Sequence, residues 1–172
     1  GSLIKCNPAI KKASDRDAIR KAVKDGTISV LATDHAPHTW EEKQGTYFNA
    51  PSGLPLIQHS LLLLLEMCEQ QCFPLETVVE RACHAPARLF QVKKRGFLRE
   101  GYWADIVIVD PAQHTDVSKS KLWSKCQWSP FPHITFTNSI HTTIVSGQIA
   151  YQEGKVHPSS QGHRVGFEKQ RR

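Results

Sequence analysis

The chain has 172 residues, of which 40% are hydrophobic and 22% are charged, and its formal net charge is +6. These values are typical of a globular protein and exclude the disordered, fibrous and membrane-protein classes. Much of the positive charge lies in residues 163–172, without a basic stripe interleaved with aromatic side chains. We therefore expect a solvated basic tail and no nucleic-acid partner.

The sequence carries no recognisable signal for export or for membrane insertion. Its most apolar segment, residues 54–67, is shorter than the roughly 20 residues that span a bilayer, and it contains Gln58 and His59. The five cysteines have irregular spacing, which argues for reduced thiols rather than a disulfide framework. These features predict a cytoplasmic protein with no membrane contact. The start Gly1-Ser2, without Met, resembles a cleavage scar left by recombinant expression, so we also expect a truncated protein.

The first half of the chain predicts alternating helices and strands. Residues 28–33 are β-branched and mostly apolar without clean alternation, as in a strand that is buried on both faces of a parallel sheet. In chain order, the expected elements are a strand at 3–6, a helix from the N-cap Ser14 to Gly26, a strand at 28–33, and helices at 54–67, at 75–83 and from Pro86. This alternation indicates an α/β fold, either a barrel or a doubly wound sheet.

The pattern changes after residue 93. Short apolar runs separated by Gly and Pro predict strands at 96–98, 104–109, 142–145 and 148–151, with a long irregular stretch at 111–138. Ser146-Gly147, between the last two runs, is a two-residue hairpin signal. We therefore divide the chain into a mixed unit, residues 1–93, and a small all-β unit, residues 94–172.

The best candidate for chemistry is Asp34, the first residue after the predicted strand at 28–33. In barrels and doubly wound sheets, ligands bind beyond the carboxyl ends of the strands. A carboxylate placed there is able to ligate a divalent metal and to move a proton between water and a leaving nitrogen. His35 and His38 add two imidazoles nearby. Taken alone, the pattern leaves an alternative open, in which Asp34 caps a turn and the histidines face solvent.

Residues 32–38, with the sequence ATDHAPH, closely resemble the signature of dihydroorotases in the amidohydrolase superfamily. The resemblance extends over essentially the whole chain through KCNP at 5–8, Gly53, APARLF at 85–90, the strand pair within 96–110 and the closing hairpin within 145–156. It implies an α/β fold made of the last two βα units of a (β/α)8 TIM barrel, residues 1–93, and the C-terminal part of a small β-sandwich domain, residues 94–172.

The reaction that this resemblance implies is the reversible hydrolysis of dihydroorotate, a cyclic amide, to N-carbamoyl-aspartate in pyrimidine biosynthesis. Asp34 is then both a zinc ligand and the catalytic residue that takes a proton from the activated water and passes it to the departing amide nitrogen. His38 binds the substrate carboxylate, Asn7 the ring, and the backbone of Gly53 the amide edge of the ring. His35 is interpreted as a supporting or structural residue.

The resemblance also implies that most of the binuclear zinc site lies outside this chain. The family uses a His-x-His pair, a carboxylated lysine and two further histidines from earlier strands, together with an arginine that grips the substrate. Since such a barrel takes roughly 250 residues, the fragment is expected to be inactive alone and to expose apolar surface. We expect a homo-oligomer, with a carbamoyl-transferase as a further candidate partner.

Three rival interpretations stay open. The first is a hydantoinase-like or allantoinase-like amidohydrolase, which residues 36–38 disfavour because those relatives usually carry other residues there. The second is a non-catalytic homologue that serves as a structural partner of a carbamoyl-transferase, against which the presence of Asp34 and His38 counts. The third is a plain β-rich interaction module in which the Asp-His loop is accidental.

Overall fold

The computed structural model of the chain describes residues 1–168, so the last four residues of the expected basic tail lie outside the described residues. The helices are α1 (Ala13–Asp25), α2 (Trp40–Lys43), α3 (Ser60–Glu69), α4 (Leu75–Val79) and α5 (Ala85–Leu89), with short 3-10 turns at Ser2–Ile4 and Ile57–His59 and a π-helical turn at Glu80–His84. The strands are β1 (Ile106–Asp110), β2 (Thr115–Asp116), β3 (Thr135–Phe136), β4 (Ser139–Val145), β5 (Gln148–Gln152) and β6 (Lys155–Val156). The α/β class is confirmed.

The predicted helix at 14–26 is confirmed as α1, but its start differs. The N-cap is Lys12 rather than Ser14, because the Asp15 carboxylate accepts a hydrogen bond from the Lys12 backbone N–H at 3.0 Å. This is the reciprocal contact of a capping box, and it fixes the first turn two residues earlier than expected. Gly26, with φ 92°, ends the helix as predicted. Val23 is the buried residue of α1 and packs with Val78.

The helices expected at 75–83 and from Pro86 form one continuous helix through α4, the π-helical turn and α5. Pro86 has no N–H to continue the α-helical ladder. The backbone N–H of Ala85 instead donates to the carbonyl of Glu80, five residues earlier. A single wider turn therefore absorbs the proline without ending the helix.

The two strands predicted in the first half of the chain are wrong as strands. Residues 2–4 form a 3-10 turn, and residues 28–33 are extended but lie in no sheet within the described part of the chain. Their backbone groups bond to helices instead, with the Leu31 N–H donating to the Arg81 carbonyl at 3.0 Å. A strand needs a neighbouring strand, and among residues 1–168 the pairing found near this segment is one isolated parallel bridge between His35 and Leu54.

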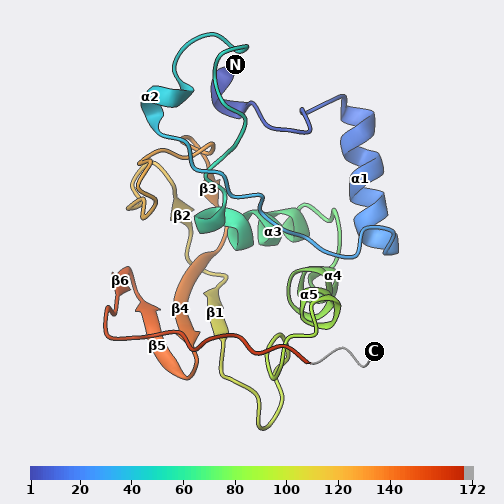
Figure 1. Cartoon of the computed structure of the whole chain (residues 1–172), viewed down its shortest axis with the longest axis vertical. Helices are drawn as coiled ribbons and strands as arrows, with labels where there is room; N and C mark the ends of the chain where they lie inside the picture. The colour runs from blue at the N-terminus through green and yellow to red at the C-terminus, as the bar shows by residue number, and fades with distance from the viewer. Residues whose placement is uncertain (169–172) are drawn as a thin grey trace.

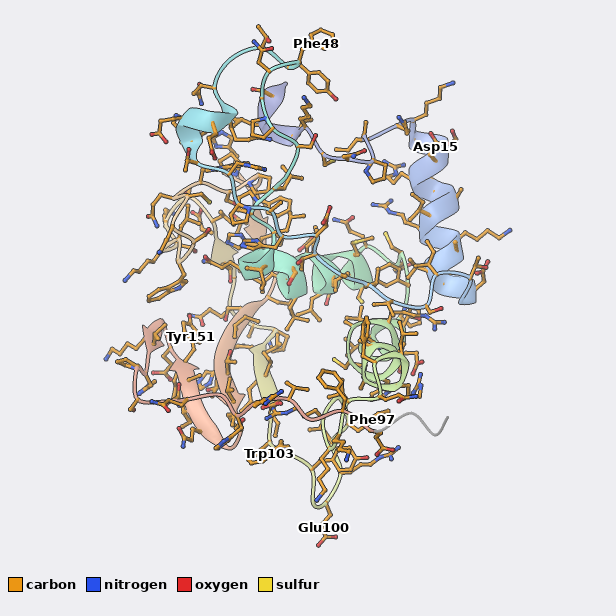
Figure 2. The ribbon with its side chains drawn as sticks, in the orientation of Figure 1. Asp15, Phe48, Phe97, Glu100, Trp103 and Tyr151 are labelled. Atoms are coloured by element: carbon orange, nitrogen blue, oxygen red, sulfur yellow. The ribbon has the colours of Figure 1, made fainter. Side chains whose placement is uncertain are left out.

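The second half contains an antiparallel sheet with the strand order β1-β4-β5-β6. Ser146 and Gly147, with φ values of 52° and 85°, make the predicted two-residue turn between β4 and β5. The strand expected at 96–98 is wrong: these residues lead to a turn whose tip carries Glu100 (Figure 2), and they pair with no strand among residues 1–168. The Phe97 ring stacks on His84 at 4.3 Å. The stretch expected to be irregular holds β2 and β3, which pair antiparallel.

The helix α3 is shared by the two halves of the chain. It crosses the middle of the molecule, with α2 and its loops on one side and the four-stranded sheet and α4–α5 on the other (Figure 1). It starts at Ser60, later than the predicted 54–67, after the 3-10 turn. Its Leu62 packs in a buried cluster with Val117 and Phe136 from the strand half. Among residues 1–168, no helix is long and apolar enough to cross a membrane.

Candidate functional site

Asp34 lies where the extended segment at 28–33 ends. Its side chain is exposed and its φ is 46°, in the left-handed region that Asp adopts more readily than most residues. This backbone turn separates the extended segment from the loop that leads to α2. The carboxylate is accessible to an ion from solvent, but its predicted place at the carboxyl end of a strand is not found, because residues 28–33 pair with no strand within residues 1–168.

The backbone after Asp34 is attached to the segment that precedes α3. The Ala36 N–H donates to the Leu54 carbonyl at 3.1 Å, beside the bridge between His35 and Leu54. His35 Nδ1 accepts a hydrogen bond from the Ile57 N–H at 3.2 Å, at the start of the 3-10 turn. His35 thus joins two segments of backbone, which agrees with its interpretation as a structural residue.

The His38 ring is held from both sides. Its Nε2 donates to the Ser52 carbonyl at 3.0 Å, since a carbonyl oxygen only accepts. Its Nδ1 faces a carboxylate oxygen of Glu42 at 3.6 Å, so the two form an ion pair when the ring is protonated. The same carboxylate caps α2 by accepting from the Thr39 N–H at 2.8 Å. The orientation of His38 is therefore determined before any substrate is present.

Gly53 is buried against the turn that carries His38. A Cβ at this position would lie 2.7 Å from the Ala36 Cβ and 3.0 Å from the His38 ring, and the φ of Gly53 is +142°. Its N–H donates to the Lys5 carbonyl at 2.9 Å. Only a glycine lets the two segments approach this closely, so residues 36–38 and 51–54 form one packed unit.

Asn7 is exposed and follows the segment that Gly53 contacts through Lys5. The structure thus packs Gly53 against His38 and links Gly53 to Lys5, which precedes Asn7 by two residues. Asp34 is connected to these residues through Ala36, two residues further along the chain, whose N–H donates to the Leu54 carbonyl. The substrate-binding roles of Asn7, His38 and Gly53 stay predictions.

Two residues at this site, Lys43 and Trp128, were missed in the sequence. The Lys43 side chain is fully buried, and the indole N–H of Trp128 donates to the His38 carbonyl at 2.8 Å. A capping-box pattern, Thr39-x-x-Glu42, is visible in the sequence and marks α2, where Lys43 lies. No local pattern shows that Lys43 is buried or that Trp128 reaches across from the other half of the chain.

The loop between α2 and Gly53 projects from this site. Phe48 is 89% exposed, and its ring points away from the molecule at the tip of the loop (Figure 2). The Lys5 ammonium holds the base of the loop by donating to the carbonyls of Tyr47 at 2.8 Å and Ala50 at 2.7 Å. The loop therefore has a fixed base and an exposed aromatic tip.

The residues that are present fit one part of a zinc site. Zinc takes about four N, S or O ligands, and the exposed Asp34 carboxylate is suited to be one of them. Within residues 1–168, no group of three or more His, Cys, Asp or Glu side chains is arranged to hold a metal.

Comparison with solved structures defines the class of the fold. The chain is similar to a hydantoinase fold represented by L-hydantoinase (dihydropyrimidinase) from Arthrobacter aurescens, with a TM-score of 0.84 and 28% identity over 91% of this chain and 36% of that chain. A D-hydantoinase structure gives a TM-score of 0.83 at 19% identity, over 90% of this chain and 35% of that one. The second likeness bears on the fold alone.

The family follows from the sequence comparisons. The model of the amidohydrolase family matches residues 6–150, and the chain belongs to this family. Dihydroorotase from Clostridium acetobutylicum is 36% identical over 154 residues, which are 89% of this chain and 36% of that protein. Dihydroorotase from Endomicrobium trichonymphae is 37% identical over 149 residues, 86% of this chain and 35% of that protein. The chain thus spans about a third of the length of these relatives, and its resemblance to dihydroorotases is confirmed.

Proposed function

We propose that the chain forms part of a zinc-dependent cyclic-amide hydrolase that converts dihydroorotate reversibly to N-carbamoyl-aspartate in pyrimidine biosynthesis. The observation that carries the proposal is the Asp34 carboxylate, which is exposed at the end of an extended segment and followed by the packed turn at 36–38. The identity of 36% to a dihydroorotase over 89% of the chain supports this substrate.

In this proposal the chain supplies the last two βα units of a (β/α)8 barrel, residues 1–93, and the C-terminal part of a β-sandwich domain, residues 94–172. The chain spans 36% of the dihydroorotase from Clostridium acetobutylicum. The activity is therefore proposed for a completed protein, in which this chain is joined to a region that corresponds to the rest of that enzyme. The isolated chain is proposed to be inactive. A cytoplasmic location and the lack of a nucleic-acid partner are parts of the same proposal.

The proposed roles follow from what each group is able to donate or accept. Zinc, when bound, supplies Lewis acidity for the attack of water on the amide carbon. Asp34 holds the metal, accepts a proton from the attacking water and delivers it to the departing amide nitrogen. In the protonated ring of His38, the Nε2–H stays on the Ser52 carbonyl, and the Nδ1–H, 3.6 Å from Glu42, is the donor that binds the substrate carboxylate. Asn7 and the backbone of Gly53 bind the ring.

The test compares Asp34→Asn with Glu41→Gln in the chain joined to the region that completes its relatives. Both changes replace an exposed carboxylate by an amide, and Glu41 lies in α2 outside the proposed machinery. We expect Asp34→Asn to lower dihydroorotate turnover by about 10²- to 10⁴-fold, the usual range for a general acid–base residue. Glu41→Gln should keep the activity. Full turnover by Asp34→Asn, or by the unaccompanied wild-type chain, would contradict the proposal.

A second candidate is hydantoin or dihydropyrimidine hydrolysis. It is favoured by the similarity to the L-hydantoinase structure, at 28% identity and a TM-score of 0.84. Turnover of dihydroorotate, hydantoin and allantoin by the same completed protein separates the candidates. We expect dihydroorotate to have the largest kcat/KM of the three substrates.

Association with further chains is also part of the proposal. Ile19 on α1 and Leu89 on α5 are apolar side chains that are 56% and 63% exposed. Apolar side chains exposed in this way are typical of surfaces that other segments or subunits cover. We propose a homo-oligomer, with a carbamoyl-transferase as a second candidate partner. Sedimentation of the completed protein, alone and with a carbamoyl-transferase, tests both.

A further inference from the structure

Lys43, the last residue of α2, places a charge where no solvent reaches. Its side chain is 0% exposed, and Nζ donates to the carbonyls of Pro51 at 2.9 Å, Gly53 at 3.1 Å and Lys5 at 3.4 Å. An ammonium has three N–H donors, so each has one acceptor. Burial, and to a smaller degree the positive charge of Lys5, lower the pKa of Lys43. Among the described residues, this cation is thus stabilised by backbone carbonyls rather than by a carboxylate.

Two of the three carbonyls connect the Asn7 segment to the Gly53 segment. Lys5 precedes Asn7 by two residues, and its carbonyl accepts from both the Lys43 ammonium and the Gly53 N–H, the latter at 2.9 Å. The Gly53 carbonyl is itself bound by Lys43. The separation of the Lys5 and Gly53 segments is therefore set by two hydrogen bonds that meet at one ammonium and by the direct hydrogen bond from the Gly53 N–H to the Lys5 carbonyl.

The same ammonium also fixes the partner of His38. Pro51 and Gly53 flank Ser52, so Lys43 holds the residues on both sides of the carbonyl that accepts from the His38 ring. If residues 51–53 moved, the His38 ring would lose the acceptor that orients Nε2. The hydrogen bonds of the Lys43 ammonium, in contrast, do not include Asp34.

We propose that Lys43 is a positioning residue that sets the relative placement of Asn7, His38 and Gly53 in the substrate site. This inference rests on the proposed function for its kinetic consequence but not for its structural one. An apolar side chain would fill the same volume, but it would leave the Pro51 and Gly53 carbonyls without the lysine donor and the Lys5 carbonyl with the Gly53 N–H alone. An arginine keeps the charge, but its planar fork does not direct three donors from a single nitrogen.

Hydrogen exchange in this 172-residue chain tests the structural part without any activity. Lys43→Met should speed exchange of the Gly53 amide by about tenfold or more, while amides within α1 keep their rates, because only the local opening is made easier. Lys24→Met is the matched control, since Lys24 is an exposed lysine at the end of α1. Unchanged exchange at Gly53 in Lys43→Met would overturn the proposal.

The Lys43→Arg variant keeps the test decisive if Lys43→Met does not fold. We expect Lys43→Arg to fold and to show exchange at Gly53 between the wild-type and fully open rates. Wild-type exchange at Gly53 in a folded Lys43→Arg would overturn the proposal, because it would mean that any buried cation holds the Gly53 segment and that the three lysine hydrogen bonds are not needed.

Kinetics of the completed protein test the functional part. Lys43→Met should raise KM for dihydroorotate by about 10- to 100-fold, since small displacements of binding groups have effects of this size. The fall in kcat should be smaller and the zinc content unchanged, with partial recovery of KM in Lys43→Arg. Lost zinc with an unchanged KM would refute the positioning role. If the wild-type protein shows no turnover, the proposed function fails while the exchange result still decides the role of Lys43.

Discussion

The close approach of Gly53 to residues 36–38 gives a prediction whose size follows from the structure. In Gly53→Ala, the new Cβ would lie 2.7 Å from the Ala36 Cβ and 2.8 Å from the Ala36 carbonyl oxygen. Non-bonded atoms of this kind prefer about 3.5–4.0 Å, and overpacking costs about 1–3 kcal/mol. The φ of +142° adds backbone strain of about 1–3 kcal/mol for a residue with a side chain.

Gly45→Ala is the control that separates these two contributions. Gly45 has a φ of +110° and no atom within 4 Å of an added Cβ, so its substitution introduces backbone strain alone. Urea unfolding followed by circular dichroism should show Gly53→Ala to be less stable than Gly45→Ala by about 1–3 kcal/mol, the overpacking cost. Gly53→Ala should also raise KM in the completed protein, because the His38 ring is displaced. Equal stability of the two variants would refute the close approach.

Three further outcomes are expected. Glu66→Gln should lower stability by about 1 kcal/mol near pH 7, because the carboxylate accepts hydrogen bonds from the Thr137 N–H at 3.1 Å and hydroxyl at 3.0 Å. The Thr137 N–H is the main cause that lowers the pKa of Glu66 from 4.5, so urea unfolding at a series of pH values should show the difference in stability shrinking as the pH falls below 4.5 and through the lowered pKa. The same difference at pH 3 would count against this prediction. Ser118→Ala should raise the pKa of Asp116 from about 2 toward 3.8 in an NMR titration, because the Ser118 hydroxyl is the main stabiliser of that carboxylate; no change would assign the low pKa to other groups. Asp34→Asn should change the free energy of unfolding by less than about 0.5 kcal/mol, since the side chain is exposed and Asn tolerates its φ of 46°, whereas a loss above about 1 kcal/mol would mean that the carboxylate supports the turn.

The sequence predicts the elements whose cause is local. The helix that became α1 has its apolar positions, its acidic first turn and its terminal glycine within one short stretch, and the turn at Ser146-Gly147 needs only two residues that accept positive φ. Both are present as expected. The segment at 28–33 has the composition of a buried strand, but hydrogen bonding to a neighbour makes a strand, and composition does not supply that neighbour.

The residues of the candidate site also differ in whether their role has a local cause in the sequence. Asp34 is found from its place after an apolar run and from the residues that follow it. Lys43 resembles any surface lysine, because its burial depends on carbonyls at 5, 51 and 53 that are brought together only in the folded chain. Pro86 shows the reverse case: its local meaning, the start of a helix, is overridden by a π-helical turn that lets the preceding helix continue.

The indole of Trp128 makes the later half of the chain a support for the earlier one. It donates to the His38 carbonyl at 2.8 Å across a separation of 90 residues, and the Gln58 side chain reaches the Lys121 carbonyl at 2.8 Å across 63. A shortened polypeptide ending near residue 110 would retain every residue for which a chemical role is proposed. It would nevertheless lose the hydrogen bond from Trp128 to the His38 carbonyl, so the proposed binding role of His38 would depend on a segment to which no chemical role is assigned.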